Sequence, residues 1–144
     1  LAGLLVSSQA FVACLPAAHA LARRRRLPLA ALAGEPLALV SRSVSPDYHA
    51  RIVAACQAAG FTPQPLHEMQ HWLSVVSLVS QGLAVALVPA ALQQAQLAGA
   101  AFVPVKDPHG TLPRYETRCL WNPARDLPAL GLFLTAVRAV GQTA

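Results

Sequence analysis

Four consecutive arginines at residues 23–26 carry the most concentrated charge in the sequence. Guanidinium groups bind phosphates through charge-assisted hydrogen bonds, so such a run suggests nucleic-acid binding. However, the net charge is +5, and removing these four arginines would leave +1. A nucleic-acid-binding domain usually spreads its basic residues over a face. We therefore interpret the run as a solvated loop, and leave open a role in long-range attraction to DNA.

Residues 67–71 read His-Glu-Met-Gln-His and match the zinc-binding signature H-E-x-x-H. That motif requires both imidazoles on one helical face, with the glutamate as base. Pro65 lies just upstream, and the segment reads as a strand that passes into a helix start. An extended chain would hold the two imidazoles too far apart to share an ion. We therefore expect neither a metal nor a cofactor.

The three cysteines, Cys14, Cys56 and Cys119, lie in apolar segments and match no zinc or C-x-x-C spacing. We expect them to be small buried hydrophobic residues with free thiols, which is typical of a reducing cytosol. The sequence also lacks a glycine-rich phosphate loop, a G-x-S-x-G motif and a pair of catalytic carboxylates. These observations argue against an enzyme.

Residues 41–46, Ser-Arg-Ser-Val-Ser-Pro, favour ligand binding. They follow an apolar strand and begin a helix, and ligands of open α/β sheets bind outside the carboxyl ends of strands. Backbone N–H groups and the positive end of a helix favour anions there, and Arg42 adds a charged donor. Ser45 is also explained as an ordinary helix cap. Residues 67–72 precede the next helix in the same way, so both junctions can face one cleft.

Buried strands alternate with helices along the chain. We read the opening residues as strand rather than as a signal peptide, because Ser7, Ser8 and Gln9 interrupt the apolar run and no basic segment precedes it. We expect further strands over residues 10–15, 37–40, 61–69, 83–88, 102–105 and 115–121, and helices over residues 46–59, 70–81 and 128–140. This order predicts an α/β fold with a mainly parallel sheet flanked by helices. The prolines at 63 and 65 indicate an edge strand, and residues 70–81 are so widely apolar that we expect a largely buried helix.

The composition is 55% hydrophobic and only 12% charged, whereas about 25% charged residues is usual. The apolar surplus predicts a surface that another domain or subunit covers. No apolar run approaches the roughly 20 residues of a membrane span, so we expect no membrane contact. The abrupt start without a methionine suggests a fragment of a longer protein.

Several stretches, in this order, resemble the effector-binding domain of LysR-type transcriptional regulators: FVACLPAAHALA, LAGEPLALV, AAGFTPQPLHE, LVSQGLAVALVP, ETRCLWN and PALGLFLTAVRAV. The most specific is LVSQGLAVALVP, residues 78–89, with Gly82 and the closing Val-Pro. The family's usual second glycine of that segment is Ala84 here. The resemblance covers nearly the whole chain and keeps order and spacing.

The resemblance implies a fold like that of periplasmic solute-binding proteins, with two α/β subdomains joined by two crossing strands. Residues 12–117 would form a largely complete second subdomain. Residues 1–11 would be a crossing strand from the first subdomain, and residues 118–144 the return strand and C-terminal helix that belong to it. Most of the first subdomain would be missing upstream of this chain.

The resemblance also implies a function. The chain would be the cytoplasmic ligand-sensing and oligomerisation domain of a bacterial regulator, forming dimers or tetramers and holding a small anion such as a carboxylate between its lobes. Promoter DNA would bind only through an absent N-terminal winged helix-turn-helix. The residues at the matching loops would contact the effector: Ser41, Arg42, Ser43, Val44, Gln70 and His71. The alternative is an extracytoplasmic solute-binding protein of similar fold.

Overall fold

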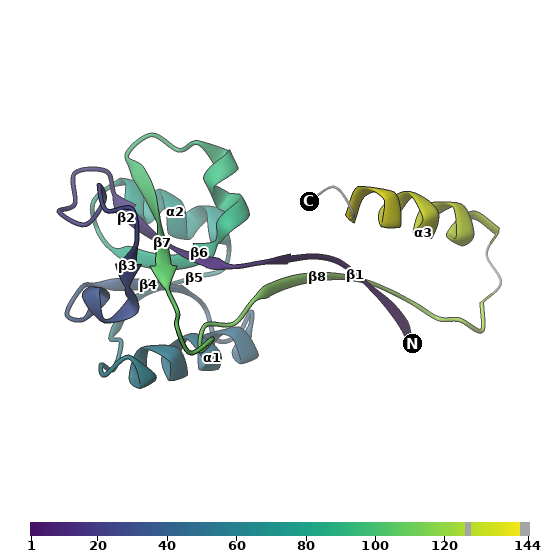
Figure 1. The fold of residues 1–144 in the computed structure, drawn as a ribbon, viewed down its shortest axis with the longest axis horizontal. Coiled ribbons are helices and arrows are strands. Elements are labelled where there is room, and N and C mark those ends of the chain that lie inside the picture. Colours follow the sequence, from purple (N-terminus) through teal and green to yellow (C-terminus); the bar gives the residue numbers. More distant parts are fainter. Residues whose placement is uncertain (126–127, 142–144) are drawn as a thin grey trace. The chain divides into compact units, whose positions relative to one another are not determined.

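The computed structural model describes residues 1–125 and 128–141 and divides the chain into two compact units (Figure 1). The larger, here called the αβ unit, comprises residues 10–113. The smaller, the terminal unit, combines residues 1–9 with residues 114–144. The assignment of residues 12–117 to a second subdomain, and of the flanking segments to a first, stays a prediction.

A six-stranded mixed sheet forms the centre of the αβ unit, in the order β3-β7-β2-β6-β4-β5. Its strands are β2 (Phe11–Pro16), β3 (Leu27–Pro28), β4 (Leu37–Val40), β5 (Pro65–Met69), β6 (Val85–Pro89) and β7 (Ala100–Lys106). Strand β2 runs antiparallel to β6 and β7, and the other three pairings are parallel. The α/β class is confirmed, and β5 lies at an edge as its prolines predicted.

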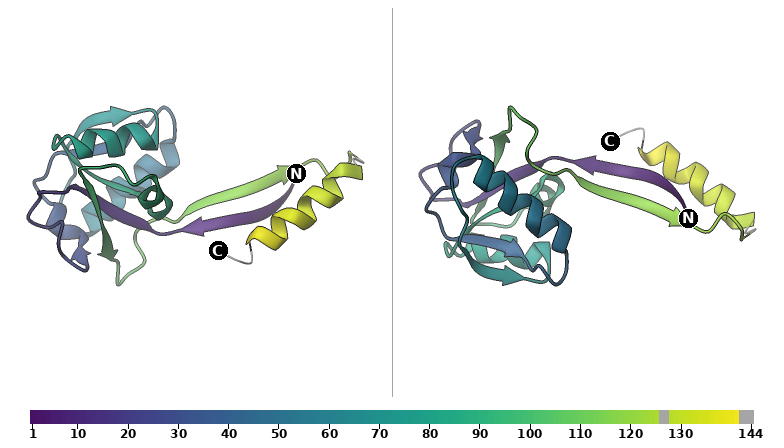
Figure 2. Two further views of the ribbon diagram at one scale, coloured as in Figure 1. Left: turned by 90° about the horizontal axis from the view of Figure 1, so that it is seen from above. Right: turned by 90° about the horizontal axis from the view of Figure 1, so that it is seen from below.

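Helices α1 (Pro46–Ala58) and α2 (Trp72–Ser80) flank this sheet on its two faces (Figure 2). Pro46 starts α1 because its fixed φ suits the first helical position, where an N–H has no helical partner. Helix α2 buries Val75, Val76 and Val79. The expectation of a largely buried α2 was wrong for Leu73, which is 54% exposed, because only one face of the helix packs on the unit.

The core of the αβ unit comes from the central strands. Every residue of β4 and of β6 is buried, and so are the first five residues of β2. All buried residues in the described part of the chain are apolar or Pro, and none is charged. Each fully buried Leu or Val stabilises the fold by about 1.5–3 kcal/mol relative to an exposed one, so burial of these strands stabilises the αβ unit.

The connection between β2 and β4 contains more structure than the sequence predicted. It includes the short strand β3, whose Leu27 is fully buried and pairs with Val105 of β7. A 3-10 helix, η1 (Leu29–Leu32), follows β3, and a second, η2 (Ala90–Ala95), follows β6. The arginine run therefore leads into an anchored segment.

The terminal unit pairs the two ends of the chain. Strand β1 (Ala2–Gln9) runs antiparallel to β8 (Tyr115–Trp121), and Arg114 donates hydrogen bonds of 2.7 and 2.8 Å to the Oγ and carbonyl oxygen of Ser8. Helix α3 (Pro128–Gly141) completes the unit. The strand predicted over residues 115–121 is confirmed, and the opening residues form a strand as expected. No helix in the described ranges is long and apolar enough to cross a membrane.

Candidate functional site

The carboxyl ends of three parallel strands, β4, β6 and β5, lie at the same end of the αβ sheet. We call this end of the sheet its carboxyl edge, as distinct from the outer strand β5. The three strands end at Val40, Pro89 and Met69, and the chain enters α1 after β4 and α2 after β5. The Ser41 N–H donates a 2.7 Å hydrogen bond to the Met69 carbonyl oxygen. This bond holds the two strand-to-helix loops side by side, as the sequence predicted.

The loop before α1 is closed by its own hydrogen bonds. The Ser43 N–H donates to Ser41 Oγ at 3.2 Å, and the N–H groups of Val44 and Ser45 donate to the Ser41 carbonyl oxygen at 3.0 and 3.1 Å. The sequence analysis expected backbone N–H groups free to bind an anion, but those of Ser43, Val44 and Ser45 already donate hydrogen bonds within the loop. The polar side chains of this loop include the exposed Arg42 guanidinium and the paired hydroxyls of Ser41 and Ser43, 2.8 Å apart.

Neither helix has a side-chain cap at its N-terminus. Ser45 occupies the N-cap position of α1 but makes no capping hydrogen bond, so the expected serine cap was wrong in this respect. His71 stands at the same position of α2, again without a capping bond. Helix α2 also has no acidic residue in its first turn, whereas α1 has Asp47. The positive end of the α2 dipole is therefore not neutralised by its own first turn.

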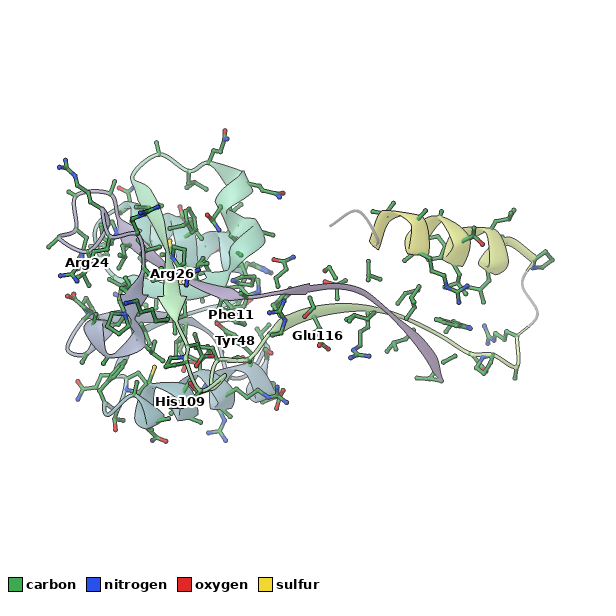
Figure 3. The ribbon with its side chains drawn as sticks, in the orientation of Figure 1. Phe11, Arg24, Arg26, Tyr48, His109 and Glu116 are labelled. Carbon is green, nitrogen blue, oxygen red and sulfur yellow. The ribbon has the colours of Figure 1, made fainter. Side chains whose placement is uncertain are left out.

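Three aromatic rings pack together at this edge, from β2, α1 and α2. Phe11, which pairs with Pro89, stacks on Tyr48 at a centroid distance of 4.8 Å. Trp72 meets the edge of Tyr48 at 4.9 Å and lies 6.1 Å from Phe11. Figure 3 shows Phe11 and Tyr48 beside each other. The sequence analysis missed this cluster; the available signal was that each ring lies next to a strand end or a helix start.

Tyr48 is buried, and its hydroxyl donates a 2.9 Å hydrogen bond to the Leu87 carbonyl oxygen. Burial, with a smaller contribution from Cys56, raises the pKa of Tyr48 well above its ordinary value. The phenol therefore stays neutral and serves as an apolar support under the two loops.

A contact between an imidazole and a carboxylate also joins the two sides of the site. His49 Nε2 lies 3.3 Å from Glu68 Oε1, without the alignment of a hydrogen bond, and connects α1 to β5. Glu68 thus has a partner outside the His67–His71 signature, and His67 lies in β5 as predicted. The described part of the chain holds no group of three or more His, Cys, Asp or Glu side chains that could bind a metal ion.

The six predicted effector residues are all at this edge. Ser41 is half-buried, and Arg42, Ser43, Val44, Gln70 and His71 are exposed. A separate cavity of about 350 Å³ lies at the amino ends of β4 and β5, between residues 34–37 and 61–64. We place the candidate site at the carboxyl edge, because helix N-termini supply anion-binding donors only there. Contact of these six residues with a ligand stays a prediction.

The thiols take no part in this site. Burial raises the pKa of Cys14 to about 12 and that of Cys56 to about 11. Both side chains are fully buried, as the sequence predicted, but the prediction was wrong for Cys119, which is only partly buried in β8. A protonated, inaccessible thiol is a poor nucleophile, so this edge offers binding groups without a reactive sulfur.

Comparison with known proteins now assigns the family. The sequence signature of the LysR substrate binding domain matches residues 1–142. The chain belongs to the LysR substrate binding domain family. The resemblance seen in the sequence is therefore confirmed, and this membership agrees with the expectation that the chain is not an enzyme.

Individual relatives of this LysR domain support the same assignment. The HTH-type transcriptional regulator IlvR of Caulobacter vibrioides is 35% identical over 115 residues, which cover 80% of this chain and 38% of that relative. The chain thus spans less than half of the length of this curated relative.

Two solved structures share the fold. The effector binding domain of BenM with its effector benzoate matches with a TM-score of 0.76 at 20% identity, over 96% of this chain and 62% of that one. Full-length CbnR with its target DNA matches with a TM-score of 0.77 at 16% identity, over 97% and 46%. The expected fold, like that of periplasmic binding proteins, is confirmed by these matches.

Proposed function

We propose that this LysR substrate binding domain senses a small anionic effector for a bacterial transcription regulator. The Ser41–Met69 hydrogen bond carries the proposal, because it joins the loops before two uncapped helices at one sheet edge. The family match over residues 1–142 supports it and favours a regulator over the alternative, an extracytoplasmic solute-binding protein.

The chemistry of this edge suits a molecule with one anionic and one apolar end. The hydroxyls of Ser41 and Ser43, the Arg42 guanidinium and the start of α2 would hold the anion. The apolar end would lie against Trp72, with Gln70, His71 and Val44 at the rim. An aromatic carboxylate has this form, and benzoate is the effector named for the BenM neighbour.

The signalling mechanism follows from a ligand that binds two conformations unequally. Residues 12–117 would form the second lobe, with residues 1–11 and 118–144 belonging to the first, and the effector would lie in the cleft between them. A ligand that contacts both lobes favours the closed state and shifts the equilibrium towards it. The complete protein would act in the cytoplasm as a dimer or tetramer and bind promoter DNA through a winged helix-turn-helix outside this chain.

A thermal-shift series tests the anionic part of the proposal. The complete regulator is melted with benzoate and short aliphatic carboxylates, each against its neutral amide, such as benzamide. At 100 times Kd a bound ligand adds about 2.7 kcal/mol to stability, so an effector raises Tm clearly. We expect at least one acid to raise Tm while its amide does not. Equal shifts from acid and amide would contradict an anionic effector.

Arg42 is the side chain whose role is easiest to isolate. In the complete regulator, Arg42→Gln should weaken binding of the most effective carboxylate about tenfold by calorimetry, which corresponds to about 1.4 kcal/mol. Arg51→Gln is the matched control, since Arg51 loses the same charge but pairs with Asp47 at 3.2 Å. Equal affinity of the Arg42 variant and the wild type would remove Arg42 from the site.

A further inference from the structure

A basic depression lies on the αβ unit apart from the candidate effector site. Arg24, Arg25, Arg26 and Lys106 line an open hollow of about 660 Å³. The three arginines come from the connection between β2 and β3, and Lys106 ends β7. Figure 3 labels Arg24 and Arg26 on this connection. Residues far apart in the sequence thus form one cationic surface, which we call the basic depression.

The backbone that carries these arginines is held on both sides. Before the run, the Ala22 N–H donates to the His19 carbonyl oxygen at 3.0 Å and the Arg24 N–H to the Leu21 carbonyl oxygen at 3.1 Å. After the run, Leu27 is fully buried in β3 against Val105. The four arginines are exposed, as the interpretation as a solvated loop predicted, but the backbone that carries them is anchored on both sides. A fixed backbone reduces the ordering cost of binding a partner.

Among the residues that the structure describes, no carboxylate pairs with the four cations of the basic depression. The contacts between carboxylates and Arg or His side chains among the described residues join His19 to Glu35, His49 to Glu68, Arg51 to Asp47 and Arg118 to Glu116. Asp107 follows Lys106, but its carboxylate accepts hydrogen bonds from Thr111 N, Thr111 Oγ1 and Leu112 N at 2.8, 2.9 and 2.8 Å. Four neighbouring cations therefore repel one another and favour an external anion.

We propose that the basic depression binds the phosphate backbone of DNA without regard to base sequence. Guanidinium groups match phosphate geometry with paired N–H donors, and Lys106 adds a point charge. The hollow is open, and the described residues that line it are all cationic, so it suits a long polyanion better than a small effector, which needs orienting polar groups and apolar walls. The proposal rests on the proposed function for one point, that promoter DNA lies near this domain in the complete regulator.

Salt-dependent binding of a labelled random 20-bp duplex to this 144-residue chain tests the proposal by fluorescence anisotropy. The logarithm of the affinity should fall with the logarithm of the salt concentration, by about 0.9 for each phosphate contacted. The variant with Arg24→Gln, Arg25→Gln and Arg26→Gln should lose about 3 from that slope, and Lys106→Gln alone about 1. All these side chains are exposed, so thermal melting should be unchanged.

The matched control replaces Arg51, Arg125 and Arg138 by Gln, which removes the same charge from exposed positions elsewhere. It should keep the wild-type slope. Equal losses in both triple variants, or no binding by the wild type at low salt, would overturn the proposal. Equal binding of a polyglutamate peptide of the same charge would also overturn it, because it would indicate an acidic protein partner. Displacement of the duplex by stoichiometric pyrophosphate would overturn it too, because it would indicate a site for a small anion. No effector enters this assay, so a failed effector screen does not affect its result.

Discussion

At the scale of single residues, Tyr48 is the side chain on which the candidate site most depends. It contacts Phe11 and Trp72 through its ring and Leu87 through its hydroxyl. The residues at the strand ends, Ser41 and Gln70 among them, could be found from the sequence because apolar strands and helix starts mark such loops. The contacts within the aromatic cluster could not, because its rings come from β2, α1 and α2 and meet only in the folded unit.

Two substitutions separate the contributions of Tyr48. Tyr48→Phe keeps the ring but removes a buried hydrogen bond, so the free energy of unfolding should fall by about 1 kcal/mol. Tyr48→Leu also removes two aromatic contacts, each worth about 0.5–1.5 kcal/mol, and should cost more. Urea unfolding followed by circular dichroism measures both. Equal losses in the two variants would show that the ring contacts contribute nothing.

The two buried thiols predict how stability depends on pH. The pKa values of Cys14 and Cys56 are raised from 9.0 to about 12 and about 11. Above pH 9 the unfolded chain loses these protons while the folded chain keeps them. Stability should therefore be fully present below pH 9 and decline as pH rises towards 11. Urea unfolding at pH 8 and pH 10 tests this, and Cys56→Ala should show a smaller decline than the wild type.

At the scale of elements, local signals placed most strands and helices correctly. Strand β8 and helix α3 follow the predicted bounds closely, because apolar spacing and flanking prolines define them. Strand β3 was missed because it has only two residues, too few for a sequence pattern, and is defined by its pairing with β7. The prediction that α2 is largely buried failed at the exposed Leu73, because the spacing of apolar residues does not show which faces of a helix pack against other elements.

Gly99 shows how one position fixes the turn before β7. Its φ is +90°, and a Cβ there would lie 2.7 Å from the Ser80 carbonyl oxygen. Gly99→Ala should therefore cost about 3 kcal/mol, from left-handed strain and overlap with backbone that cannot move aside easily. Gly34, with φ +80° and open space, is the control: Gly34→Ala carries only the strain, about 1–2 kcal/mol. Equal losses by urea unfolding would rule out the overlap.

At the scale of the whole molecule, the apolar surplus is most visible in the terminal unit. Its exposed hydrophobic side chains include Leu5, Leu120, Leu132 and Phe133. The composition predicted such surfaces, and a first lobe or a second copy of the chain would cover them in the proposed regulator. Composition alone could not say which hydrophobic side chains would be exposed. In β1 and β8, the exposed side chains are known only once the pairing of these two strands is known.

The location of the bound effector tests the central claim most directly. The amide signals of the regulator are followed by NMR while the carboxylate that raises Tm most is added. The account predicts shifts at Arg42, Ser43, Gln70, His71 and Trp72, at the carboxyl edge of the sheet. Shifts confined to residues 34–37 and 61–64, around the cavity at the opposite edge, would contradict it.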